Sequence, residues 1–131
     1  MGSKNLSIPS FFPAGEAKFQ ATLRQLSKDL SLDSATEATL MACLDGEEVR
    51  SVLHSFFSGI LKSQAATLGT LLYRIDIPEK KVKALNRLNQ EQWLQALVEL
   101  TLERCYQKVC LREFFSAEKK KQLNGSKNRI D

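Results

Sequence analysis

The chain has 131 residues, of which 43% are hydrophobic and 26% are charged, so it has the size of one domain and the composition of a globular protein. Three prolines and six glycines are few for an all-β chain with many tight turns, and the abundant Leu, Ala, Lys, Glu and Gln residues favour helices. The net charge is +4, but residues 117–131 carry five basic and two acidic side chains, which excludes a strongly basic face on the fold itself.

The first third of the chain predicts an extended arm and two helices. Residues 1–13 hold two adjacent aromatic side chains between two prolines, and such an arm either lies on its own domain or docks on a second copy. A helix is expected over 14–30, where apolar residues recur every three or four positions; these are Phe19, Leu23, Leu26 and Leu30. A short second helix is expected over 35–44, capped by Asp33 or Ser34.

The middle of the chain predicts one long helix over residues 46–75. Asp45 is a natural N-cap, and Glu48 stands three residues later, as a capping box requires. Apolar residues then keep a helical spacing as far as Ile75, and no proline interrupts them before Pro78. The apolar stripe is wide, so this helix is expected to pack against several neighbours at the centre of the protein.

The helix predicted over residues 46–75 contains too many polar and charged residues to span a membrane. A transmembrane helix needs about 20 consecutive apolar residues. Lys62 and Arg74 leave only residues 63–73 free of charge, and this window contains Gln64 and two threonines. We therefore expect no membrane association.

The last third predicts a short helix, a long helix and a polar tail. Pro78 suits the first turn of a helix that continues to about residue 88. Asn89 and Gln92 form a second capping box, which starts a helix over 90–115. We therefore expect an all-α fold, a compact bundle of about five helices with two long ones (46–75 and 90–115) and three shorter ones. The arm (1–13) precedes a single helical domain (14–116), and a basic polar tail (117–131), turn-like or disordered around Asn124, follows it.

Two places in the sequence are candidates for contact with a partner. Gln64 lies where the periodicity points inward, so its amide is either partly exposed or bonded to a neighbouring helix, or it holds a polar atom of a small ligand. The small residues Ala65 and Gly69 allow close approach of another backbone, from the same chain or across a homodimer. Phe11 and Phe12 are the second candidate, as an arm exchanged between two copies.

The sequence contains no pattern of residues typical of catalysis, metal binding or cofactor binding. The only histidine, His54, shares one helix face with Ser58, but a catalytic triad needs groups from different elements. The three cysteines have neither CxxC nor Cys–His spacing, and no phosphate-binding glycine motif occurs. We therefore expect no enzyme activity, no metal and no cofactor. An odd number of cysteines without a secretory signal predicts reduced thiols in a cytoplasmic protein, with Cys110 the most exposed.

Nucleic-acid binding is the alternative to protein–protein interaction. A helix-turn-helix is conceivable around residues 73–93, together with the lysine-rich tail. The candidate contacts are Arg74, Lys80, Lys81, Lys83 and Arg87. Acidic residues dilute this charge, and few side chains suited to reading bases are present. The sequence therefore favours a non-enzymatic interaction module that associates with a protein partner or with a second copy of itself as a homodimer.

Overall fold

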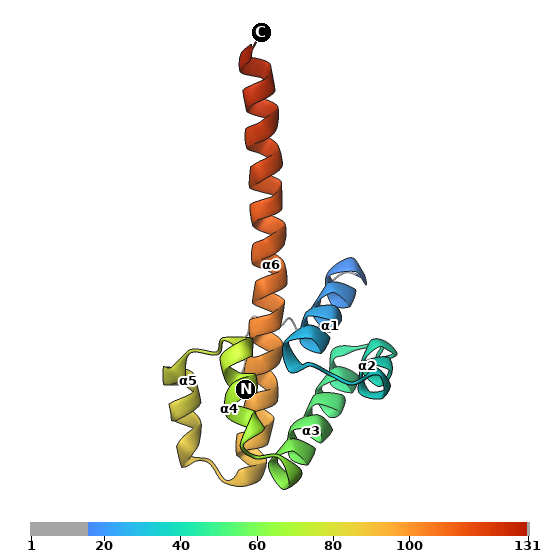
Figure 1. Ribbon diagram of the computed structural model, residues 1–131, viewed down its shortest axis with the longest axis vertical. Helices are drawn as coiled ribbons and strands as arrows, with labels where there is room; N and C mark the ends of the chain where they lie inside the picture. Colours follow the sequence, from blue (N-terminus) through green and yellow to red (C-terminus); the bar gives the residue numbers. More distant parts are fainter. Residues whose placement is uncertain (1–15, 131) are drawn as a thin grey trace.

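A computed structural model describes the backbone of residues 16–130 and the side chains of residues 17–121. These residues form helices and no strand, which confirms the all-α class, with six α-helices instead of about five (Figure 1). The elements are α1 (Glu16–Leu30), α2 (Ser34–Met41), α3 (Gly46–Ser63), α4 (Thr67–Ile75), α5 (Glu79–Ala84), the 3-10 helix η1 (Leu85–Arg87) and α6 (Gln90–Ile130).

Helix α6 is the central column, and the other helices surround its first half (Figure 1). Helices α1 and α3 make the most extensive packing with α6, and α4 packs against both α1 and α6. The predicted apolar stripe on α1 is almost completely buried, and α6 contributes a matching stripe. The stripe on α6 is formed by Leu94, Leu97, Val98, Thr101, Leu102, Cys105 and Val109.

The helix predicted over residues 46–75 is two helices, so this prediction is wrong. Helix α3 ends at Ser63, and Gln64 leaves the helical conformation with φ −143° and ψ 49°. The hydroxyl of Ser63 donates to the carbonyl of Gly59 at 2.8 Å, a local side-chain bond that competes with helix propagation. A turn then leads into α4, which packs against α1. The break therefore lets one apolar segment cover two different surfaces.

Both predicted N-caps are present, and the capping box is complete at Asn89, whereas at Asp45 the returning bond goes to the preceding residue. The Asp45 side chain accepts from the backbone N–H of Glu48 at 2.9 Å, and the Glu48 carboxylate accepts from the N–H of Leu44 at 2.6 Å. At the start of α6, the Asn89 side chain accepts from the backbone N–H of Gln92 at 2.8 Å, and the Gln92 side chain accepts from the backbone N–H of Asn89 at 3.4 Å. These bonds satisfy N–H groups that a helix start leaves without partners.

Helix α6 continues to Ile130, although the sequence predicted its end near residue 115. Residues 117–123 are mostly Lys, Glu, Gln, Ala and Leu, which have high helix propensity, and no proline stops the helix. Gly125 costs about 1 kcal/mol inside a helix, which weakens it without ending it. The second half of α6 therefore projects beyond the bundle (Figure 1).

A polar seam fixes α6 against α1. The ammonium group of Lys108 donates to the Asp29 carboxylate at 2.6 Å, and both side chains are largely buried. The Gln25 amide also donates to Asp29, at 3.0 Å, and Arg112 donates to the Gln25 side-chain oxygen. The Cys105 thiol lies 3.6 Å from the same carboxylate. This network sets the position along α6 at which α1 crosses it.

Candidate interaction surface

The small residues of the predicted partner site lie at the break between α3 and α4. Gln64, Ala65 and Gly69 are all exposed, so the Gln64 side chain faces solvent, although the helical periodicity points it inward. A Cβ built on Gly59 or Gly69 would meet no atom within 4 Å, so neither glycine serves close packing inside the chain. Phe11 and Phe12 lie outside the described residues.

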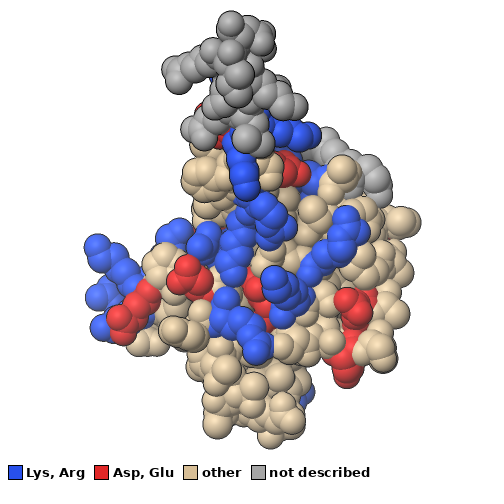
Figure 2. Space-filling model, turned by 45° about the horizontal axis from the view of Figure 1, so that its top comes forward, with Lys and Arg blue, Asp and Glu red and all other residues tan. Residues whose placement is uncertain are grey.

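The cations proposed for nucleic-acid contact are dispersed among acidic side chains. Figure 2 shows Lys and Arg side chains over one face, with Asp and Glu side chains between them. Lys80 and Arg87 are exposed. The other three have partners in the chain: Arg74 donates to Ser31, Lys81 lies 3.4 Å from Glu103, and Lys83 lies 3.7 Å from Glu79.

At the upper end of the bundle, where Glu113 contacts Lys18, α6 carries three of the exposed large apolar side chains of residues 17–121, close together in the sequence. We call Cys110, Leu111, Phe114 and Phe115 the α6 patch. Leu111 is 49% exposed, Phe114 56% and Phe115 62%. The two phenylalanine rings make an edge contact, with centroids 5.5 Å apart. Isolated exposed apolar residues are ordinary, but a cluster on one helix marks a surface suited to a partner.

Helix α1 covers one side of α6 beside this patch. Lys18, near the start of α1, lies 3.6 Å from Glu113, and Arg112 faces Gln25. Next to the patch, on the surface of α6, is a shallow hollow of about 290 Å³. Its lining is formed by Tyr106, Gln107, Cys110 and Leu111. The patch therefore combines protruding rings with a recess that can receive an apolar side chain.

The α6 patch is not among the sites that the sequence predicts, although Cys110 is predicted to be exposed. The predicted buried stripe ends at Val109, and residues 110–115 fall in the last turns of the predicted helix. The sequence does contain one sign of the patch. Leu111 and Phe114 are three residues apart, and this spacing places them together on the side of the helix opposite the core stripe.

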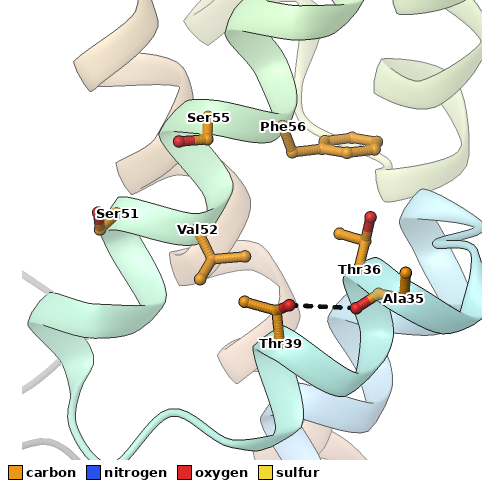
Figure 3. A pocket seen from close by; sticks show the side chains of 7 residues that line it. All are labelled: Ala35, Thr36, Thr39, Ser51, Val52, Ser55 and Phe56. Carbon is orange, nitrogen blue, oxygen red and sulfur yellow. Dashed lines mark hydrogen bonds between the residues drawn. The ribbon is translucent and has the colours of Figure 1, made fainter.

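A second recess lies between α2 and α3 (Figure 3). It has a volume of about 420 Å³ and is lined by Ala35, Thr36, Thr39, Ser51, Val52, Ser55 and Phe56. Val52 and Phe56 extend towards α2, and the Thr39 hydroxyl already donates to the Ala35 carbonyl at 3.1 Å. No titratable side chain lines this groove, so its own residues offer no acid–base or metal-binding chemistry.

His54 takes part in a surface contact between helices. Its Nε2 lies 3.0 Å from the Glu91 carboxylate at the start of α6.

Across residues 17–121, no three His, Cys, Asp or Glu side chains are grouped so that they could hold a metal ion. No helix among the described residues is both long and apolar enough to cross a bilayer.

The three thiols differ in exposure as the sequence predicted. Cys43 and Cys105 are buried, whereas Cys110 is partly exposed. Burial raises the pKa of both buried thiols, and the nearby Asp29 carboxylate raises that of Cys105 further. Since the thiolate is the reactive form, both buried thiols are held in an unreactive state.

We expect one thiol per native chain to react rapidly with Ellman's reagent at pH 8, and all three to react in denaturant. The Cys110→Ser variant is the control, and it should lose the rapid reaction. Rapid reaction of a second thiol in this variant would contradict the burial of Cys43 and Cys105.

Comparisons of the chain with known protein families, with curated proteins and with solved structures find no match.

Proposed function

We propose that this chain is a non-enzymatic interaction module that associates with a second copy of itself through the α6 patch. The observation that carries the proposal is the exposure of Leu111, Phe114 and Phe115 on a helix that projects beyond its own bundle. Covering these side chains removes apolar surface from water, which is the main driving force of association.

The length of α6 supports the same proposal. The contact between Lys18 and Glu113 lies near the upper end of the bundle, and the helix then continues to Ile130. An isolated helical segment of about 15 residues is only marginally stable in water, and helices in proteins gain most of their stability from packing. A second chain lying along this segment would supply that packing.

Phe114→Ala tests the proposal against a matched control. Loss of a buried phenylalanine ring removes about 1.5–3 kcal/mol, and the dimer loses one ring from each chain, so its dissociation constant should rise by at least about a hundredfold. Tyr73→Ala removes another exposed aromatic ring, 88% exposed on α4, and should leave association unchanged. Sedimentation velocity of both variants across micromolar concentrations measures the effect. Equal behaviour of the two variants would contradict a role for the patch.

Nucleic-acid binding through residues 74–87 and the lysines of α6 is the second candidate. Its support is the set of exposed cations, Lys80, Arg87 and Lys119–Lys121, none of which has an ion-pair partner among the described side chains. Retention on DNA or RNA that weakens steeply with salt would favour this function, because phosphate contacts release counterions.

A further inference from the structure

The connection between α3 and α4 interrupts the helical hydrogen bonds only briefly. The backbone N–H of Gln64 still donates to the Ile60 carbonyl at 2.8 Å, and the N–H of Thr67 donates to the Gln64 carbonyl at 2.8 Å. In between, the N–H groups of Ala65 and Ala66 have no backbone partner within the described part of the chain. A straight helix would supply these partners, because each N–H then reaches the carbonyl four residues earlier.

The sequence around this connection does not encode a helix start. Helices α2, α3 and α6 each begin with a side chain that caps their first N–H groups, whereas Ala66 at the start of α4 makes no capping bond. Residues 62–67 are exposed, so packing of these residues does not hold the bend. The Lys, Gln and Ala residues among them have high helix propensity. The bend is therefore maintained by the docking of α4 elsewhere in the fold.

The same connection divides the helices into two parts that are each held together internally. In the first part, Ser27 on α1 donates to the Glu37 carboxylate on α2 at 2.6 Å, and α2 packs against α3. In the second part, Arg104 on α6 donates to the Asp76 carboxylate at the end of α4 at 3.0 Å, and α4 packs against α6. Residues 64–66 join the two parts, and Figure 1 shows the chain reversing its direction there.

The contact between these two parts is the main core of the protein. Helices α1 and α3 of the first part pack against α6 of the second, and α1 also packs against α4. If α3 and α4 became one straight helix, α4 would turn away from its own α1. The same core contacts could then form between two chains, each supplying one part to the other. Such an exchange is a low-cost route to a dimer, because the contacts of each exchanged part remain the native ones.

From these observations we infer that the connection between α3 and α4 is a hinge, which can straighten so that two chains exchange the part from α4 to α6. The exchanged dimer is distinct from association through the α6 patch and does not depend on it. Exchange requires α6 to separate from α1 and α3, which opens the core. It therefore occurs when chains refold together, and the dimer then persists because its separation is slow.

A proline at the hinge tests the inference. The φ angle of Ala66 is −64°, which suits a proline ring, and its N–H has no backbone partner to lose. Ala66→Pro should therefore leave the native monomer folded. In a straight helix the same proline would remove a hydrogen bond and clash with the Lys62 carbonyl, once in each chain. The concentration at which half of the chains refold as dimers should rise by more than about a thousandfold.

The experiment uses the full chain with Phe114→Ala, which disables association through the α6 patch. Refolding from urea at millimolar concentration should yield, besides the monomer, a dimer that persists on dilution, as measured by light scattering coupled to size-exclusion chromatography. Adding Ala66→Pro should remove this dimer. Ser34→Pro is the matched control, because Ser34 is the first residue of α2 and follows Asp33, whose extended conformation suits a following proline. The control should leave the dimer unchanged.

A second variant keeps the test decisive if proline disturbs the monomer, which circular dichroism would show. Gln64 has φ −143° and ψ 49° at the bend, outside the helical region, so Gln64→Gly should weaken the straight helix more than the bent one. The concentration for half dimerisation should rise by about tenfold.

These outcomes separate the hinge from the proposed function. A Phe114→Ala chain that refolds only as a monomer would overturn the hinge, and self-association through the α6 patch would be unaffected. Equal amounts of dimer in the Ala66→Pro and Ser34→Pro chains, or a dimer that Gln64→Gly does not weaken, would also overturn it.

Discussion

Replacing Phe57 with alanine is expected to lower the free energy of unfolding by about 4 kcal/mol, as is typical of a fully buried phenylalanine. Phe57 is completely buried in the core on α3. The truncation removes the transfer free energy of the ring and leaves a cavity that the surrounding helices fill only in part. Urea denaturation followed by circular dichroism measures the change.

Phe56 provides the matched control on the same helix. It is adjacent in sequence, its ring lies 5.5 Å from that of Phe57, and it lines the open groove between α2 and α3 (Figure 3). Because it is only partly buried, Phe56→Ala should cost about half as much or less. An equal loss in the two variants would contradict the position of the core described above.

Replacing Lys108 with alanine is expected to destabilise the protein by about 3 kcal/mol, because it leaves a buried carboxylate without its cation. The Asp29 side chain is only 7% exposed and the Lys108 side chain 19%. Lys108 also donates to the Arg74 carbonyl at 3.4 Å, so the variant loses a contact with α4 as well. Thermal and urea unfolding of the variant measure the loss.

Lys81→Ala is the control for this ion pair. Lys81 also forms a salt bridge with α6, to Glu103, but its side chain is 51% exposed. An exposed pair contributes about 1 kcal/mol or less. If the Lys108 and Lys81 variants lost the same stability, the polar seam between α1 and α6 would not be the buried network described here.

The sequence predicts best those features that depend on a few neighbouring residues. The stripe from Phe19 to Leu30 is buried as its spacing predicts, because a helix in this fold has a single core to face. The caps at Asp45 and Asn89 are also as predicted, since a capping box is a local hydrogen-bond pattern.

The break after Ser63 could not be read from the sequence. Apolar residues on either side of it keep the same helical phase, and neither proline nor glycine occupies residues 64–66. What ends α3 is the packing of α4 against α1, a contact between segments about 45 residues apart. The end predicted for α6 near residue 115 is wrong because polar residues can still form a helix: the segment after residue 116 is polar but has high helix propensity.

The α6 patch could not be identified from the sequence, because its exposure depends on which sides of α6 the other helices cover. Leu111 and Phe114 resemble core residues in the sequence, and only the crossing of α1 near Arg112 shows that they face away from it. Gln64 illustrates the converse, because the helical periodicity points it inward but the residue lies at an exposed helix end.

The molar mass of the full chain in solution tests self-association most directly. Light scattering coupled to size-exclusion chromatography should give a mass that rises with concentration from 14.8 kDa towards twice that value over the micromolar range. Phe114→Ala should remain near the lower mass at the same concentrations. A wild-type mass of 14.8 kDa at every concentration would contradict self-association through α6.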